Sequence, residues 1–525
     1  MIEIAPAPAA AQASSSVVRT AVRHLTLAGL TLCTLLIHGY HPLAEDGGLY
    51  VAGIESALNP ALFPHDLAFA SATRHYSLFS PLMAHIVTGL HIPLPWLLLL
   101  TSLLGTWIML YAAWRIAAHC TPSQPAQLCA VALLAAWFTL PIAGTSLLLM
   151  DPYVTARTLS TPLSLLALSF ALASDRYNKR PLLLCILSLV IAALFHPLMA
   201  AYAAAFIIAL LIAKLPTHHA RVITWIALAA CALLIASALQ AIAPPESPAI
   251  IASAHSRYYW FLSQWQWFEL LGLIGPLAIF ALLLRLAHRT LGEPGTALCR
   301  AAIGIGLIAT LICLLFAHES YNTHLVARLQ PLRTFLLIYA VMIVLLAATL
   351  AQAAFSSSSR PLLRTLPPLF LAAMAITFFS VQRQNFPASH HLELPGRKPV
   401  NAWTEAFLWS RDNTPTNALF ALDANYISTE GEDAQTFRAT AQRSMLPDFS
   451  KDGGEAAVRP TLAEAWFAGM TAQKNLSRLT DEQRGERLRP LGVTWIILHA
   501  NAPTATPCPY RNTVVKVCSL APLPR

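Results

Sequence analysis

Charged residues are scarce in this chain. Of its 525 residues only 11% are Asp, Glu, Lys or Arg, whereas 56% are hydrophobic, and soluble domains carry roughly 25% charged residues. The hydrophobic residues gather in blocks of about 15 to 25, which is the length that a helix needs to cross a bilayer. The scarcity of charge therefore excludes an ordinary soluble domain and predicts a polytopic α-helical integral membrane protein in a lipid bilayer.

Three further patterns are missing. No basic helix with interleaved aromatic residues occurs, so the formal net charge of +9 does not indicate nucleic-acid binding. No paired CxxC motifs and no HxxxH motif occur, which argues against a structural zinc site. No convincing internal repeat is present, and this removes support for the two-fold repeats that are common in secondary transporters.

The apolar blocks predict about eleven transmembrane helices. They lie near residues 25–40, 94–114, 126–143, 158–174, 182–195, 198–213, 222–243, 268–286, 301–317, 334–353 and 365–381. No A-x-A-like cleavage site follows the first block, which we interpret as an uncleaved span. His196-Pro197 divides the long run at 182–213 into two short spans.

Loop charges predict the orientation. Loops rich in Arg and Lys alternate with loops that hold most of the acids, which by the positive-inside rule places the N-terminus in the cytoplasm. An odd number of spans then places residues 382–525 outside. We expect a protein of the bacterial inner (plasma) membrane with an extracytoplasmic, periplasmic C-terminal domain.

The chain divides into three parts on this basis. Residues 1–18 are a Pro/Ala/Ser-rich tail that we expect to be disordered. Residues 19–381 form the transmembrane domain. Residues 382–525 alternate between helix-like and strand-like segments, which predicts a small α/β domain. The long outer loops of the transmembrane domain are 41–93, 144–157, 244–267 and 318–333.

Two cysteines stand apart from the seven in or near the spans. Cys508 and Cys518 flank "PYRNTVVKV", a segment that can fold back as a hairpin. A disulfide between them is expected outside the cytoplasm. The alternative is two free buried thiols.

Polar side chains crowd the predicted outer side of the membrane. Most of the 18 histidines, most outer-loop acids and five arginines lie there. A transporter would more typically bury its polar groups in mid-membrane. The asymmetry indicates an outer-facing reaction or binding cavity.

The stretch "EDGGLY", residues 45–50, opens the first outer loop. Together with the many spans and the soluble outer domain, it resembles the GT-C superfamily of membrane glycosyltransferases, in which a first-loop motif often reads Asp-Glu-x-x-Tyr. Asp46 and Tyr50 take the Asp and Tyr positions. Gly47 stands where the second acid belongs, although Glu45 precedes Asp46. The resemblance implies transfer of a sugar from a polyprenyl-phosphate carrier to a glycan, lipid or protein acceptor at the outer face.

Such a transfer needs a base for the acceptor, positive charge for the departing phosphate and an apolar groove for the lipid. Asp46 is our first candidate for the base and Glu45 the second; the alternative is that both solvate a loop or that Asp46 caps the following helix. Arg328 and Arg333 are candidates for the phosphate, or else they contact lipid headgroups.

Further candidates for substrate binding lie in the same loops. Asp151 and Arg157 either pair structurally or line the cavity, and Arg257 sits in an aromatic segment typical of the membrane interface. His41 and His196 each precede a proline and either form polar turns or bind substrate. The remaining candidates are Tyr50, Arg74 and His75.

No cofactor is required by the sequence. A divalent cation, Mg²⁺ or Mn²⁺, held by His41, Glu45, Asp46 or His75 stays open, because carboxylate and imidazole ligands suit these ions. Two functions other than glycosyl transfer also stay open. They are a transporter of lipid-linked substrates and a non-catalytic assembly or sensor protein whose extracytoplasmic domain binds a partner.

Overall fold

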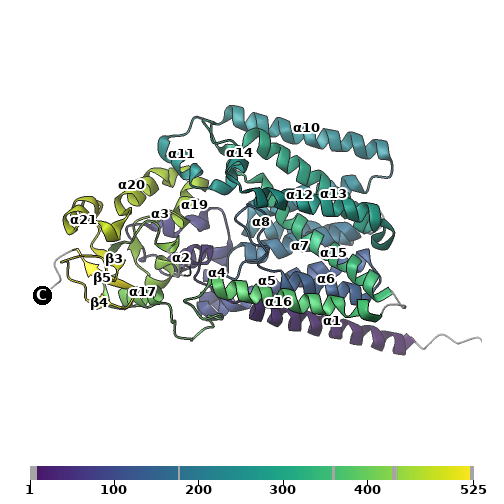
Figure 1. Ribbon diagram of the computed structural model, residues 1–525, viewed down its shortest axis with the longest axis horizontal. Coiled ribbons are helices and arrows are strands. Elements are labelled where there is room, and N and C mark those ends of the chain that lie inside the picture. Colours follow the sequence, from purple (N-terminus) through teal and green to yellow (C-terminus); the bar gives the residue numbers. More distant parts are fainter. Residues whose placement is uncertain (1–8, 175–177, 357–360, 429–432, 434, 521–525) are drawn as a thin grey trace, which may run out of the picture.

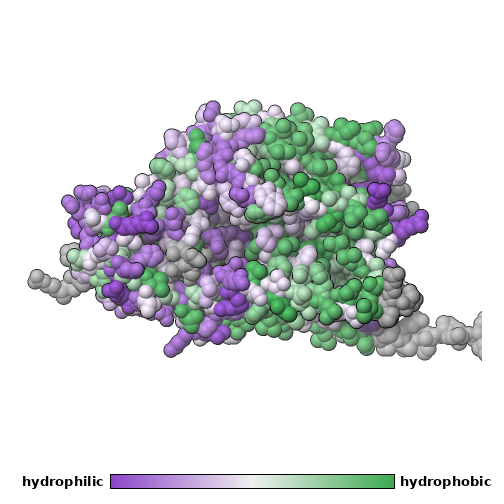
Figure 2. All heavy atoms as spheres, viewed as in Figure 1, coloured by the Kyte–Doolittle hydropathy of each residue, from purple (hydrophilic) through white to green (hydrophobic). Residues whose placement is uncertain are grey.

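The computed structural model describes residues 9–174, 178–356, 361–428, 433 and 435–520. A bundle of apolar helices occupies one side of the molecule and the C-terminal segment the other (Figure 1). Figure 2 shows the hydrophobic surface over the bundle and the hydrophilic surface mainly over the C-terminal segment and the far end of the bundle. This distribution suits a bundle surrounded by lipid and a C-terminal segment in water.

Each of the predicted apolar blocks forms a helix. They are α1 (Ala9–His38), α5 (Leu94–Cys120), α6 (Gln124–Ala136), α7 (Arg157–Ala173), α8 (Arg180–Phe195), α9 (Pro197–Ala213), α10 (His218–Ile242), α12 (Trp267–Leu286), α13 (His288–Phe316), α15 (Phe335–Ser356) and α16 (Leu366–Asn385). Within the described residues, 7 helices are long and apolar enough to cross a membrane, and α6 to α9 are shorter apolar helices. The chain is thus an integral membrane protein, and the count of eleven spans stays a prediction.

The start of α1 differs from our expectation, and the break between α8 and α9 agrees with it. Of the tail expected at 1–18, residues 1–8 lie outside the described part of the chain, and from Ala9 onward the backbone is helical, where we expected disorder. The break at His196-Pro197 is real, because the Nδ1 atom of His196 accepts a hydrogen bond from Met199 N and Pro197 occupies the first turn of α9. Proline there lacks only an N–H that would have no helical partner.

The C-terminal segment contains a mixed five-stranded sheet. Its strands, in the order β2-β1-β3-β5-β4, are β1 (Leu419–Ala421), β2 (Ser444–Met445), β3 (Trp495–His499), β4 (Tyr510–Arg511) and β5 (Val515–Ser519). β1 runs parallel to β2 and β3, and β5 runs antiparallel to β3 and β4. The helices are α17 (Ala402–Asn413), α18 (Phe437–Ala441), α19 (Lys451–Val458), α20 (Ala463–Gln473) and α21 (Asp481–Leu488). Cys508 and Cys518 form a disulfide beside the β4–β5 pair.

The segment predicted as the first outer loop joins the two parts. It contains α2 (Asp46–Leu58), α3 (Leu67–Ala70) and α4 (Phe79–Leu90), and it lies between the bundle and the C-terminal segment (Figure 1). The Arg438 guanidinium of α18 donates to Asp66 at 2.5 Å and to Asp452 of α19 at 2.8 Å. All three side chains are buried. Because an unpaired buried charge is costly, this triad fixes α19 against the first loop.

Two short helices complete the same end of the bundle. α11 (Pro248–His255) and α14 (Leu325–Arg328) lie in the predicted loops 244–267 and 318–333. The structure therefore gathers the predicted long loops and the C-terminal segment at one end of the bundle.

Candidate functional site

The N-terminus of α2 packs tightly against its surroundings. A Cβ atom on Gly47 would lie 2.6 Å from the Pro42 carbonyl oxygen, and one on Gly48 would lie 1.6 Å from Thr436 Oγ1. The position at which the GT-C motif carries its second acid thus has no room for a side chain. Glu45 instead precedes the helix with a φ of 51°, a left-handed conformation that is rare for a residue with a side chain.

Asp46 does not cap α2. The helix begins at Asp46 itself, and the preceding Glu45 makes no capping hydrogen bond. The two carboxylate oxygens of Asp46 accept from different cations: Arg157 Nη2 donates to Oδ2 at 3.0 Å, and Lys451 Nζ donates to Oδ1 at 3.1 Å. The capping alternative is therefore wrong, and Asp46 is the centre of an ion-pair network.

Arg157 links two acids from different loops. Its guanidinium donates to Asp46 and, through Nε and Nη2, to Asp151 Oδ2 at 3.1 and 2.9 Å. Asp151 and Arg157 form the expected pair, and of the two only Arg157 lines a cavity.

That cavity, which we call the charged cavity, has a volume of about 300 Å³. Its charged and hydrogen-bonding side chains include Glu45, Asp46, Tyr50, Tyr76, Tyr153, Arg157, His196, Arg257, Gln330, Arg333, Lys451 and Glu455. These residues come from the first loop, the segments that follow α6, α8, α11 and α14, and the C-terminal segment. Groups that are far apart in the sequence therefore face one enclosed space where the bundle meets the C-terminal segment.

Lys451 and Glu455 are the charged residues of the cavity that sequence reasoning missed. Both lie on α19, whose sequence "KDGGEAAV" contains two glycines and gives only a weak helix signal. Lys451 contacts both Glu45 and Asp46. Burial alone would lower the pKa of Lys451, but the two carboxylates hold it above its ordinary value, so that the amine stays charged.

Glu455 combines burial with an oxygen that has no partner. Its carboxyl is 6% exposed, Tyr76 donates to its Oε1 atom at 2.7 Å, and its Oε2 atom contacts no described donor. Burial raises the pKa of Glu455 to about 7, with the negative charge of Asp46 adding to the effect. A carboxyl with a pKa near the working pH can both accept and return a proton.

Asp46 is less suited to that task. Burial alone would raise its pKa, but Lys451 and Arg157 outweigh burial and hold the pKa of Asp46 below its usual range. A carboxylate of low pKa is a weak base. Of these two carboxyls, Glu455 is thus the stronger proton acceptor, and Asp46 pairs with both cations.

The arginines predicted for phosphate binding differ from one another. Arg333 lines the charged cavity, lies 5.4 Å from the Tyr259 ring centre and has a buried Nε atom with no described partner. Within the described residues no carboxylate pairs with it. Arg328 points elsewhere: it donates to Glu246 at 2.8 Å and to the Ala457 carbonyl at 2.7 Å. Arg328 therefore pairs with an acid and does not line the charged cavity.

Arg257 borders the charged cavity and also supports α19. It donates to the carbonyl oxygens of Ser450 at 2.8 Å and Phe449 at 3.1 Å. Its guanidinium thus holds the backbone directly before Lys451.

His196 lines the cavity as a neutral imidazole, since burial, with Arg157 and Arg333 nearby, lowers its pKa to about 3.

Five predicted residues do not line the charged cavity: Asp151 and Arg328, described above, and His41, Arg74 and His75. His41 is buried against Phe386, with the ring centres 3.7 Å apart, and its Nδ1 atom lies 3.2 Å from Glu393. Arg74 and His75 are exposed on the first loop. Sequence proximity to Asp46 did not distinguish these residues from Tyr76, which does line the cavity.

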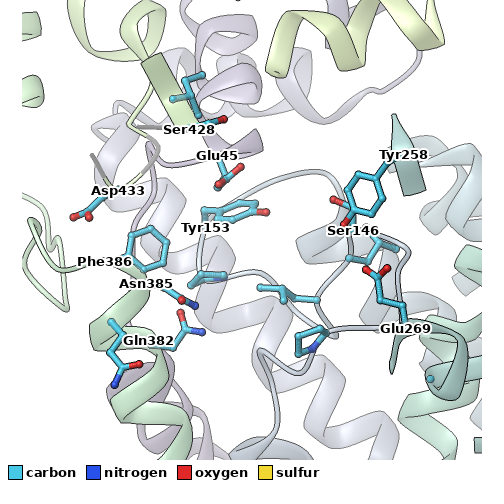
Figure 3. Close-up of a pocket in the computed structure, with 18 of the residues that line it drawn as sticks. Glu45, Ser146, Tyr153, Tyr258, Glu269, Gln382, Asn385, Phe386, Ser428 and Asp433 are labelled. Carbon is cyan, nitrogen blue, oxygen red and sulfur yellow. The ribbon is translucent and has the colours of Figure 1, made fainter. Parts of the chain in front are cut away.

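A larger cavity of about 1060 Å³ adjoins the charged cavity. The two share Glu45, Ser146 and Tyr153. Figure 3 shows Tyr153 and Glu45 on one side, the end of α16 with Gln382 and Asn385 on a second, and Glu269 of α12 with Tyr258 on a third. Its mixed polar and apolar walls could accommodate most of an amphipathic molecule.

The donor set does not fit the divalent cation that the sequence left open. Within residues 9–520, as far as the structure describes them, no group of three or more His, Cys, Asp and Glu side chains could hold a metal ion. The oxygens of Asp46 are already shared between an ammonium and a guanidinium, and His41 and His75 lie apart from it.

No family model matches the chain, and no curated protein matches its sequence. Its structure is similar to solved structures of oligosaccharyltransferase from Archaeoglobus fulgidus, one of which is described as AglB. One, in complex with an inhibitory peptide and a dolichol-phosphate, has a TM-score of 0.49 and 11% identity over 91% of this chain and 69% of that chain. A complex with Zn and sulfate has a TM-score of 0.42 and 13% identity over 90% of this chain and 68% of that chain. The apo form has a TM-score of 0.44 and 12% identity over 91% of this chain and 69% of that chain.

Proposed function

We propose that this protein is a GT-C-type membrane glycosyltransferase that transfers a sugar from a polyprenyl-phosphate donor to an acceptor at the outer membrane face. One observation carries the proposal. Four cations and a carboxyl with a pKa near 7 line a single cavity at the end of an apolar helix bundle. A lipid-linked phosphate ester needs this combination of positive charge, a base and a neighbouring apolar region.

In the proposed reaction the donor phosphate binds beside Arg333, whose guanidinium, unlike that of Arg257, is not engaged by backbone carbonyl groups among the described residues and has a buried Nε atom without a partner. The acceptor attacks the anomeric carbon, and the bond between that carbon and the phosphate oxygen breaks. The electron pair of this bond leaves with the lipid phosphate, where Arg333 and Arg257 stabilise the negative charge. Glu455 accepts the proton of the attacking group through its unpartnered Oε2 atom.

The two cavities together have room for parts of both the donor and the acceptor. The charged cavity has room for a phosphate and one sugar, and the larger cavity, joined to it at Tyr153 and Glu45, has room for the remainder of one substrate. The helices around the larger cavity are apolar, which favours entry of a lipid-linked molecule from the membrane. Residues 382–525 would lie outside the cytoplasm in this arrangement.

The test measures sugar transfer in proteoliposomes that contain the purified full chain and a radiolabelled polyprenyl-phosphate sugar. We expect Glu455→Gln to abolish transfer, whereas Glu486→Gln, on the exposed face of α21, retains it. A wild-type chain that moves the labelled donor across the bilayer without transferring its sugar would be a transporter. A chain that neither transfers nor moves any such donor would favour the assembly or sensor alternative.

A further inference from the structure

The Lys451 ammonium group lies between the two acids of the first loop. Its Nζ atom is 3.1 Å from Asp46 Oδ1 and also contacts Glu45 Oε2. The Lys451 side chain is 13% exposed, whereas those of Glu45 and Asp46 are 36% and 31% exposed. A buried cation thus bridges two partly accessible carboxylates from one side.

The position of this ammonium is fixed by the surroundings of α19. Asp452 binds the buried Arg438, Asp448 accepts from Lys451 N at 2.6 Å, and Arg257 holds the preceding carbonyl groups. At the other end of α19, Arg328 donates to the Ala457 carbonyl. Because the backbone of α19 is held at both ends, the Cα atom of Lys451 is fixed relative to the first loop.

The two carboxylates would otherwise be suited to a metal ion. Adjacent acidic side chains at a cavity surface offer the hard oxygen ligands that Mg²⁺ and Mn²⁺ prefer. With Lys451 in place, the oxygen of Asp46 that faces away from Arg157 is occupied by an N–H donor. The charge of the pair is offset by Lys451 and in part by Arg157, which also binds Asp151.

We propose that Lys451 takes the place of a divalent metal ion at the Glu45–Asp46 pair, so that a cation belonging to the C-terminal segment keeps the site free of metal. A short polar residue at position 451 would then expose a latent metal site made of Glu45, Asp46 and water. The consequence for catalysis rests on the proposed function, whereas the consequence for metal binding does not.

The experiment is a Mn²⁺ titration followed by electron paramagnetic resonance, on the full-length chain in detergent. We expect no stoichiometric binding by wild type, by Lys451→Arg or by Lys474→Ser, which removes an exposed lysine from the end of α20. We expect Lys451→Ser to bind about one Mn²⁺ per chain, at least about 30-fold more tightly than wild type. The additional change Asp46→Asn should remove this binding. Thermal unfolding of each variant shows that it is folded.

Two results of the Mn²⁺ titration would overturn the inference. One is a wild-type chain that binds one Mn²⁺ in a manner abolished by Asp46→Asn, and the other is a folded Lys451→Ser variant that binds none. A second arm measures transfer in excess EDTA, where wild type should keep its full rate. Loss of that rate, restored by Mn²⁺, would refute the metal-free site and leave the glycosyltransferase proposal standing. Absence of transfer in every condition would refute the proposed function, and the Mn²⁺ titration would still decide the inference.

Discussion

Lys451 Nζ lies 3.1 Å from Asp46 Oδ1, although the two residues are 405 positions apart in the chain. One belongs to α19 in the C-terminal segment and the other to the first turn of α2. The charged cavity therefore belongs to neither part alone, and its charge balance depends on how the C-terminal segment docks on the first loop.

The pH dependence of transfer should report Glu455. Because only the ionised carboxylate accepts a proton, and burial raises its pKa to about 7, the rate should rise with pH through about 7 and level off above it. Glu455→Gln should lower the rate by about 100-fold or more and remove this inflection. Initial rates at saturating donor, from about pH 5.5 to about pH 9, provide the measurement.

Tyr76→Phe supplies a matched control for that profile. The hydrogen bond from Tyr76 to Glu455 lowers the pKa of the carboxyl, so its loss should move the inflection to higher pH without removing it. A wild-type profile that is flat around pH 7, or an inflection unchanged in Glu455→Gln, would contradict the assignment of the base.

Arg333 and Arg328 should separate substrate binding from stability. Arg333→Ala removes a cation that lacks a carboxylate partner, so we expect kcat/KM for the donor to fall about 10- to 100-fold with little change in Tm. Arg328→Ala breaks a buried pair with Glu246 and should lower the free energy of unfolding by about 2–4 kcal/mol, with the KM for the donor unchanged. Kinetics and thermal unfolding of both variants give the comparison, which fails if the two effects are reversed.

Glu55 should make the protein less stable as the pH rises. It is 8% exposed on α2, and burial raises its pKa to about 8, above the value of about 4.3 expected in the unfolded chain. The folded state therefore favours the protonated form, and the stability that this form contributes is complete below about pH 4.3 and lost as the pH rises towards about 8. Glu55→Gln keeps the acceptor for Gln442 and mimics the protonated form. This variant should raise the free energy of unfolding by about 1–3 kcal/mol near pH 8 and change it little near pH 4. Thermal unfolding at both pH values provides the measurement, and an equal change in Tm at the two values would contradict the raised pKa of Glu55.

The disulfide should stabilise the sheet without affecting transfer. Cys508 and Cys518 are separated by 10 positions and close a short loop at the β4–β5 edge, remote from the residues that line either cavity. Replacing both by serine should cost about 2–3 kcal/mol. Thermal unfolding with and without reductant should show this loss in wild type and no effect of reductant in the double variant, while transfer stays at the wild-type rate.

Much of the fold followed from composition and periodicity. The apolar blocks became helices because a long hydrophobic segment in a membrane can satisfy its backbone only as a helix. The gathering of Asp46, Arg157 and Arg333 at one end of the bundle followed from loop charge, which constrains the side of the membrane on which each loop lies.

The partners within that end could not be read from the sequence. Arg328 and Arg333 are indistinguishable in "HLVARLQPLR", yet only Arg328 meets Glu246, 82 positions away. α19 was missed because Gly453 and Gly454 weaken a helix signal. Tertiary packing explains one of these glycines, since a Cβ atom on Gly453 would lie 3.1 Å from Arg257 Nη2 and 3.0 Å from Trp466 Nε1.

The place of α19 in the chain also bears on biogenesis. All the apolar helices precede it, the last of them ending at Asn385, and a polypeptide emerges from the ribosome in sequence order. The helices that flank Asp46 and Arg157 can insert, and these two residues can meet, before Lys451 and Glu455 have been synthesised. Under the proposed function, a nascent chain is consequently inert until α19 has been synthesised and has docked on the first loop.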